Sequence, residues 1–163
     1  MISCTSILVA IDFSAASDKA LLYGRELARL MCAKLHVIHV VRDMVAAGMM
    51  SPTDVAEIGR VQRDLETSAR KRLRALIDDG ADRDTSPTIV VRVGSSPATE
   101  ILDYVKEYPI GLVVVGSHGQ SAVAHLLLGS VAEQIVRRAT CPVLTVRSRE
   151  RDFIQPATLP AAG

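Results

Sequence analysis

Three glycines and a serine stand at fixed intervals between an apolar segment and an amphipathic one. Gly116 follows the apolar run Leu112–Val115, Gly119 comes after two further residues, and Gly129 and Ser130 follow after nine more. Glycine lets the backbone approach a ligand closely, and consecutive N–H groups in such a loop can converge on an anion. The free N–H groups and the dipole at a helix N-terminus add to this attraction. The chemistry that this pattern suits is the binding of a phosphate group.

Two strands and a helix must position this loop. Leu112–Val115 is short and rich in β-branched residues, which predicts a strand buried on both faces. A helix is expected to start near Ser130 and to end before Pro142, and Val143–Val146 is predicted to be the next strand. The apolar positions of that helix are Val131, Ile135 and Val136.

The rest of the chain alternates between strand-like and helix-like segments. Together with the elements above it gives five strands and four helices. This alternation predicts an α/β fold with right-handed βαβ units, that is, a doubly wound parallel sheet with helices on both faces. The further strands are expected at Ile7–Ile11, Lys34–Val41 and Thr88–Val93, and the helices from Ser14, near Thr53 and at Pro97 after an N-cap at Ser96.

One domain is expected. A chain of 163 residues is long enough to bury a core, and residues 1–147 are predicted to form this domain. From Ser148 the composition changes to charged residues and then to Pro and Ala, so residues 148–163 are expected to be a flexible tail.

The spacing Gly116-x2-Gly119-x9-Gly129-Ser130 resembles the nucleotide-binding signature of the ATP-binding branch of the universal stress protein family. The segments Ile7–Asp12, His36–Val40 and C-P-V-L-T-V extend the resemblance as far as Arg147. It implies a sheet of order 3-2-1-4-5 in an adenine nucleotide alpha hydrolase-like fold. The implied function is that of a stress-response regulatory protein that binds ATP, or AMP or ADP, at the carboxyl ends of strands 1 and 4, where the strand order reverses.

The resemblance also implies roles for single residues. Gly119, Gly129 and Ser130 would contact phosphate, with Ser130 as helix cap as well, although a tight turn and an ordinary cap would need the same residue types. Asp12 would lie near the ribose and phosphates, where Mg²⁺ or Mn²⁺ could bridge it to the nucleotide. Its structural alternative is an N-cap of the following helix, a position for which Ser14 competes.

The remaining site residues are expected around the base and the loop. Val40 would read the adenine edge through its backbone groups, and His118 could donate to a phosphate. Apolar side chains would line the base or ribose. The residues completing this set are Ala10, Ile11, Val115, Gly116 and Val131.

Several enzyme signatures are absent from the sequence. It contains no G-x4-G-K-[ST] for a P-loop and no G-x-G-x-x-G in the first βα turn, and it lacks the G-x-S-x-G of α/β-hydrolases. No lysine lies in the predicted phosphate loop, so ATP hydrolysis is expected to be slow if it occurs. The alternatives to a nucleotide-dependent regulator are a slow ATPase and a homodimeric interaction module that needs no nucleotide.

Composition narrows the location and the partners. The net charge of +1 and the 3% of aromatic residues give no footprint for nucleic acid or for an anionic membrane surface. No apolar run approaches 18 residues, and the N-terminus lacks a signal-peptide pattern. Three scattered cysteines, Cys4, Cys32 and Cys141, indicate free thiols, the last two expected to be buried. We therefore expect a cytoplasmic protein.

The final strand predicts a homodimer. Pro142 suits the beginning of an edge strand, and Val143–Val146 is apolar with no charge to protect it before Arg147. Pairing with its own copy across a two-fold axis would cover this edge, as the resemblance also implies. The alternative is that the tail covers the edge and leaves a monomer.

Overall fold

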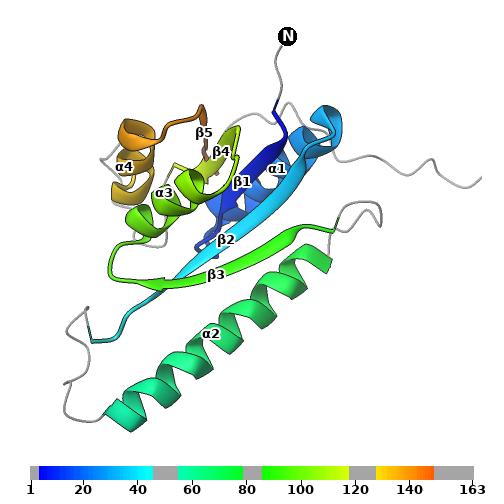
Figure 1. Cartoon of the computed structure of the whole chain (residues 1–163). Helices are drawn as coiled ribbons and strands as arrows, with labels where there is room; N and C mark the ends of the chain where they lie inside the picture. Colours follow the sequence, from blue (N-terminus) through cyan, green and yellow to red (C-terminus); the bar gives the residue numbers. More distant parts are fainter. Residues whose placement is uncertain (1–3, 46–54, 79–85, 118–127, 149–163) are drawn as a thin grey trace, which may run out of the picture.

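The computed structural model describes residues 4–45, 55–78, 86–117 and 128–148 (Figure 1). Strands and helices alternate along the chain, as the sequence predicts. The strands are β1 (Ser6–Ala10), β2 (Lys34–Arg42), β3 (Thr88–Gly94), β4 (Leu112–Gly116) and β5 (Val143–Val146). The helices are α1 (Ala15–Met31), α2 (Val55–Asp78), α3 (Pro97–Glu107) and α4 (Ser130–Arg138).

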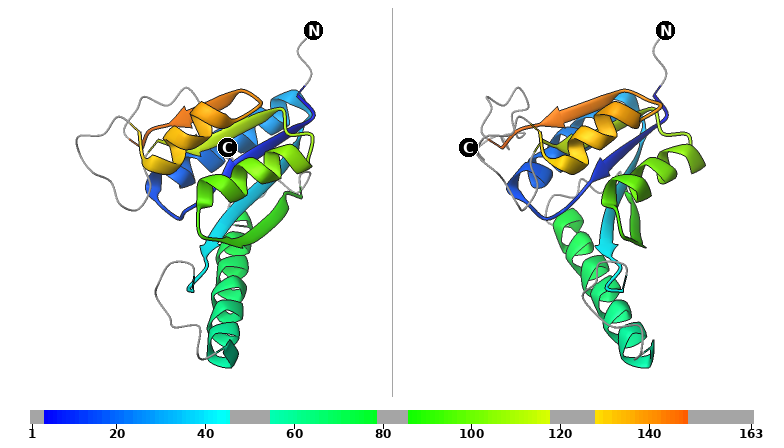
Figure 2. Two further views of the ribbon diagram at one scale, coloured as in Figure 1. Left: turned by 60° about the vertical axis from the view of Figure 1, so that its left-hand side comes forward. Right: turned by 90° about the vertical axis from the view of Figure 1, so that its left-hand side faces the viewer.

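The five strands form one parallel sheet in the order β3-β2-β1-β4-β5, which confirms the predicted architecture. Helices α1 and α2 cover one face and α3 and α4 cover the other (Figures 1 and 2). β1 lies in the centre, and its residues are buried on both sides because each face carries a separate apolar core. The order reverses between β1 and β4, so the carboxyl ends of these two strands form the predicted ligand edge.

Local sequence explains how α1 and α3 begin. Ser14 is the N-cap of α1, and it forms a capping box with Ser17. Ser96 is the N-cap of α3, its hydroxyl accepts from Thr99 N, and Pro97 occupies the first helical turn. The predicted N-cap at Ser96 is therefore confirmed.

The predicted burial of Cys32 is wrong. This residue ends α1 with a φ of 51°, in the left-handed region, and its side chain is exposed. The following amide, Ala33 N, donates to Ala28 O over 2.9 Å, so the helix end is closed by backbone hydrogen bonds and the thiol points outward. Cys4, Cys32 and Cys141 are all free thiols, as expected.

The fully buried side chains described in α2 lie in its C-terminal half. The buried residues among its described side chains are Ala69, Leu73 and Ile77, whereas Leu65 is 39% exposed. Figure 2 shows the N-terminal half of this helix extending away from the sheet. The apolar stripe of α2 is thus partly solvent-facing.

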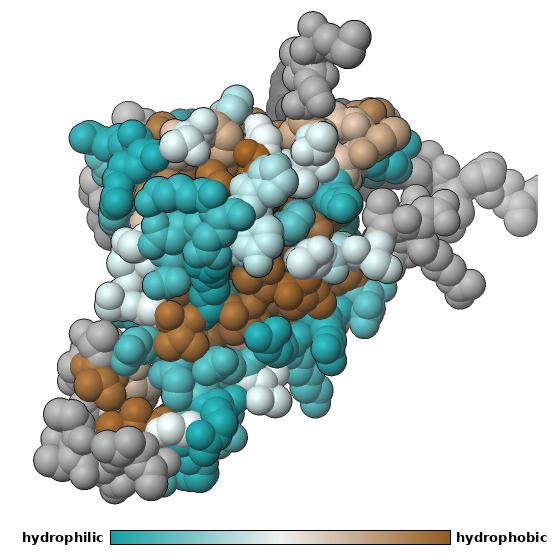
Figure 3. Space-filling model, in the orientation of Figure 1, coloured by the Kyte–Doolittle hydropathy of each residue, from teal (hydrophilic) through white to brown (hydrophobic). Residues whose placement is uncertain are grey.

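Both edges of the sheet are apolar. β5 forms one edge, and β3 forms the other, with six of its seven residues half-buried. Figure 3 shows the β3 edge as a continuous hydrophobic band.

Within the described residues, no helix has the length and apolar character needed to span a bilayer.

Two histidines of β2 are expected to make stability depend on pH. Burial lowers the pKa of His36 and of His39 below the ordinary value of 6.5; Lys34 lowers that of His36 further, whereas a backbone hydrogen bond to Ile11 partly offsets the shift of His39. The unfolded chain therefore binds more protons than the folded one just below pH 6.5. Their contribution to stability is complete above pH 6.5 and is lost as the pH falls through the lowered folded-state pKa values.

Urea unfolding at pH 7.5 and at pH 5.5 checks this expectation. The free energy of unfolding should be smaller at pH 5.5, and His36→Gln should reduce the difference between the two pH values. An equal pH dependence in both proteins would contradict a role for His36.

Candidate functional site

The turn after β1 fixes the carboxylate of Asp12 at the carboxyl end of that strand. Asp12 Oδ1 accepts from the backbone N of Ser14 (3.1 Å) and from Ser14 Oγ (2.6 Å). Ser14 is the N-cap of α1, so the structural alternative for Asp12, an N-cap, is not realised. Phe13 between them has a φ of 62°, a left-handed conformation that is uncommon for a bulky residue.

Hydrogen bonds bring the start of α4 to the carboxyl end of β4. Ser117, which is 1% exposed, donates its backbone N–H to Val146 O (2.7 Å) and accepts from Gly129 N (2.6 Å) through its carbonyl. The chain therefore leaves β4 and returns to the same point before α4 begins. Two predicted loop residues, His118 and Gly119, lie outside the described residues.

The predicted cap at Ser130 is wrong. α4 begins at Ser130, and the N-cap is Gly129, which has no side chain to accept from the first-turn amides. The N-termini of α1 and α3, in contrast, are closed by serine hydroxyls. Gly129 thus leaves the first-turn N–H groups of α4 without a hydroxyl cap of the kind seen in α1 and α3, and Ser130 is exposed beside them.

Backbone groups of Val40 point toward the space beyond β1. Alternate residues of a strand direct their backbone groups to opposite neighbours, and Lys34 N–Thr5 O and Ile11 N–Ile38 O show that the even-numbered residues of β2 face β1. The next rung would join Val40 N to Ile11 O, but within the described residues no such backbone hydrogen bond is made. The N–H and C=O of Val40 therefore face the edge where β1 has ended.

The predicted apolar residues separate onto two faces. Ala10, Val40, Val115 and Val131 belong to the core under α3 and α4, on the side from which α4 begins. Ile11, in contrast, packs into the core under α1 and α2, because successive residues of an extended chain point to opposite faces. The side chain of Ile11 thus cannot line the same surface as the other four.

Gly116 has a packing role that the sequence does not reveal. A Cβ at this position would lie 2.9 Å from the backbone C of Ala16 and 3.0 Å from Ser17 N. The absence of a side chain therefore lets the first turn of α1 approach the end of β4. Whether Gly116 also contacts a ligand stays a prediction.

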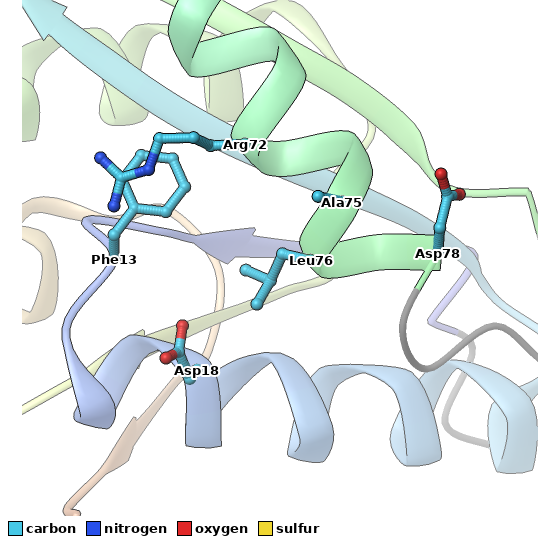
Figure 4. A pocket seen from close by; sticks show the side chains of 6 residues that line it. All are labelled: Phe13, Asp18, Arg72, Ala75, Leu76 and Asp78. Carbon is cyan, nitrogen blue, oxygen red and sulfur yellow. The ribbon is translucent and has the colours of Figure 1, made fainter.

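A surface groove of about 760 Å³ lies on the other face, between α1 and α2 (Figure 4). It shares Phe13 with the turn after β1, and Asp18 and Arg72 flank it. Burial raises the pKa of Asp18, the nearby charge of Asp12 raises it further, and Arg72 acts in the opposite direction. Most of its lining side chains are exposed, and it does not contain the predicted residues; the lining is Phe13, Asp18, Arg72, Ala75, Leu76 and Asp78.

Metal ligands are sparse. In the part of the chain that the structure describes, no group of three or more His, Cys, Asp or Glu side chains could hold an ion. A divalent ion at Asp12 would therefore need further ligands, such as the phosphates of a nucleotide.

Comparisons with known proteins agree with this architecture. A model of the universal stress protein family matches residues 4–147. Universal stress protein YxiE of Bacillus subtilis (strain 168) is 34% identical over 145 residues, which cover 86% of this chain and 97% of that protein. The structure of universal stress protein UspA from Lactobacillus plantarum is similar with a TM-score of 0.76 at 24% identity, covering 90% of this chain and 100% of that chain.

Two similar structures hold adenine nucleotides. One is a universal stress protein in complex with cAMP, with a TM-score of 0.56 at 23% identity, covering 90% of this chain and 99% of that chain. The other is the universal stress protein from Archaeoglobus fulgidus in complex with dAMP, with a TM-score of 0.56 at 21% identity, covering 89% of this chain and 99% of that chain. At these identities the likeness establishes the fold.

Proposed function

The chain belongs to the universal stress protein family, and from this premise we propose that it binds an adenine nucleotide at the carboxyl ends of β1 and β4 and acts as a nucleotide-dependent regulatory protein in the stress response. ATP is the proposed ligand, because the spacing of Gly116, Gly119 and Gly129 resembles that of the ATP-binding branch. The cAMP and dAMP complexes of similar proteins support an adenine nucleotide as the ligand.

The observation that carries the proposal is the convergence of three unlike groups at one edge of the sheet. Asp12 follows β1, and the backbone groups of Val40 face the space past β1. Ser117 holds Gly129, the N-cap of α4, at the end of β4. A carboxylate suits a ribose or a phosphate-bound ion, a backbone N–H and C=O suit a base edge, and helix amides suit phosphate. Asp12 would hold Mg²⁺ or Mn²⁺ only together with the phosphates, and such an ion would neutralise their charge.

Isothermal titration of the full chain with ATP, in the presence and absence of Mg²⁺, tests the proposal. Saturable binding with a dissociation constant in the micromolar range is expected, with a weaker response to CTP. Absence of binding to ATP, ADP and AMP would overturn the proposal and favour the interaction module that needs no nucleotide.

We further propose a homodimer that pairs the two copies of β5. Val113 N donates to Pro142 O (3.0 Å) and Ser117 N donates to Val146 O (2.7 Å), so the even-numbered residues of this segment face β4. By alternation, Val143 and Thr145 direct their backbone N–H and C=O away from the sheet. Those outward groups are the ones that a second copy would use.

A proline at the outward position should separate pairing from folding. Thr145→Pro removes an N–H that takes no part in the β4–β5 ladder, so light scattering at tens of micromolar should show a monomer with a folded circular dichroism spectrum. Val93→Pro is the matched control, because Asp43 N–Gly94 O (3.2 Å) places the backbone groups of Val93 outward on the β3 edge. If the dimer survives Thr145→Pro and is lost in Val93→Pro, the interface lies at β3 instead. If the wild type is a monomer and dimerises only after truncation at Arg147, the tail covers the β5 edge.

A further inference from the structure

The ladder between β1 and β2 ends at a side chain. Ile11 N donates to Ile38 O (2.8 Å), which continues the parallel pattern one residue past β1. The carbonyl of Ile11, the acceptor of the next rung, lies 2.7 Å from Nδ1 of His39. A carbonyl oxygen only accepts, so Nδ1 of His39 carries the proton and donates it.

The ring of His39 is fixed by its surroundings. Its centroid lies 4.6 Å from that of Phe13, and the guanidinium of Arg72 lies 3.8 Å above the Phe13 ring. Figure 4 shows Arg72 reaching from α2 to this ring. The left-handed conformation of Phe13 costs of the order of 1–2 kcal/mol, so these contacts are needed to hold the turn in place.

The ring nitrogen of His39 and the amide of Val40 are the two donors of β2 nearest to Ile11 O, and among the described residues only the bond from His39 is made. They come from adjacent residues of β2 and approach Ile11 O from the α1 side and from the plane of the sheet, respectively. Because the side chain of His39 holds this oxygen, the chain can turn away at Asp12 without leaving Ile11 O unpaired. Among the described residues, the amide of Val40 then has no backbone acceptor.

We propose that His39 is a positioning residue of the nucleotide site, which occupies Ile11 O and thereby keeps the N–H of Val40 available to the edge of a purine base. This role rests on the proposed function. The base of a bound nucleotide would accept from Val40 N–H through a ring nitrogen and donate its amino group to Val40 C=O. His39 itself would not touch the ligand.

Two variants test the hydrogen-bond donor of His39 and its aromatic ring separately. His39→Phe keeps an aromatic ring against Phe13 but cannot donate, whereas His39→Asn places an amide donor near the position of Nδ1 and lacks the ring. Circular dichroism and thermal melting establish that each variant is folded. If His39→Phe does not fold, His39→Leu gives the same loss of the donor with a smaller side chain.

The first measurement needs no nucleotide. Amide hydrogen exchange of Val40, followed by NMR, should be fast in the wild type and about tenfold or more slower in His39→Phe, because Ile11 O then accepts from Val40 N–H. His39→Asn should exchange like the wild type. A Val40 amide that is already protected in the wild type, or that is unaffected by His39→Phe, would overturn the proposal.

The second measurement compares ATP with inorganic tripolyphosphate, which has the phosphates but no base. His39→Phe should weaken ATP binding about tenfold and change tripolyphosphate binding by less than about twofold, and His39→Asn should restore most of the ATP affinity. If His39 had only a structural role, His39→Phe would weaken the binding of ATP and of tripolyphosphate equally. This result would overturn the role proposed for His39 but not the proposed nucleotide binding. A wild type that binds no ATP would instead overturn the proposed function, and with it this role of His39.

Discussion

Replacing Gly129 by Asp is expected to weaken ATP binding about 100-fold while leaving the melting temperature unchanged or slightly raised. The φ of −68° and ψ of 154° at Gly129 are accessible to any residue, so the backbone need not change. An aspartate at this N-cap accepts from the first-turn amides of α4, which stabilises the helix and occupies the donors proposed for phosphate. Its negative charge also repels the phosphates.

Gly129→Asn is the matched control, because it caps the helix without adding charge. Its ATP affinity should fall about tenfold, between the wild type and the aspartate variant, and its melting temperature should follow that of Gly129→Asp. Isothermal titration and thermal melting on the same samples check both quantities. Wild-type ATP affinity in a folded Gly129→Asp would rule out phosphate binding at the start of α4.

Gly116→Ala is expected to destabilise the fold by about 2–3 kcal/mol and to lower the melting temperature by roughly 4–12 °C. The new Cβ would lie 2.9 Å from the backbone C of Ala16, and a helix backbone cannot rotate aside as a flexible side chain does. The first turn of α1 would therefore have to move. Since Ser17 Oγ in that turn accepts from the amide of Ser14 (3.1 Å), ATP affinity should fall as well.

Gly59→Ala provides the opposite case within the same chain. Gly59 lies inside α2, and the nearest atom to a new Cβ is Nη1 of the flexible Arg63 side chain, at 3.4 Å. Alanine should therefore stabilise the protein by about 0.5–1 kcal/mol through helix propensity. Urea unfolding of both variants measures the difference, and an equal effect of the two substitutions would contradict the packing role of Gly116.

Sequence patterns predict the elements of this fold because the deciding signals are local. β-branched runs mark the strands, and the Ser96-Pro97 pair marks the start of α3 within one residue. The strand order, in contrast, follows from the family resemblance and not from any periodicity. Alternation along β2 also explains why His36 and His39 lie on opposite faces of the sheet, where they contact the Tyr104 hydroxyl and the Ile11 carbonyl respectively.

The errors concern residues whose surroundings are set by distant parts of the chain. Gly129 rather than Ser130 caps α4, because the chain returns to Ser117 O one residue earlier than the serine would suggest. The role of His39 depends on where β1 leaves the sheet, and the left-handed φ of Phe13 has no glycine to signal it. Alternation along β1 could have placed Ile11 on the face opposite Ala10, and this signal was available in the sequence.

Because its buried side chains lie near one end, α2 is anchored to the sheet at its C-terminal part, and its N-terminal part extends far from this anchor. At about 1.5 Å per residue, the 24 residues of α2 extend about 36 Å, and its buried side chains lie between Ala69 and Ile77. Pivoting about Leu73, a tilt of about 5° would move the Val55 end by roughly 2–3 Å and the Cα of Arg72 by only about 0.1 Å. The contact between the Arg72 guanidinium and the Phe13 ring would therefore change little when the N-terminal end of α2 moves. A small tilt of α2 would therefore leave the turn that carries Asp12 almost unchanged.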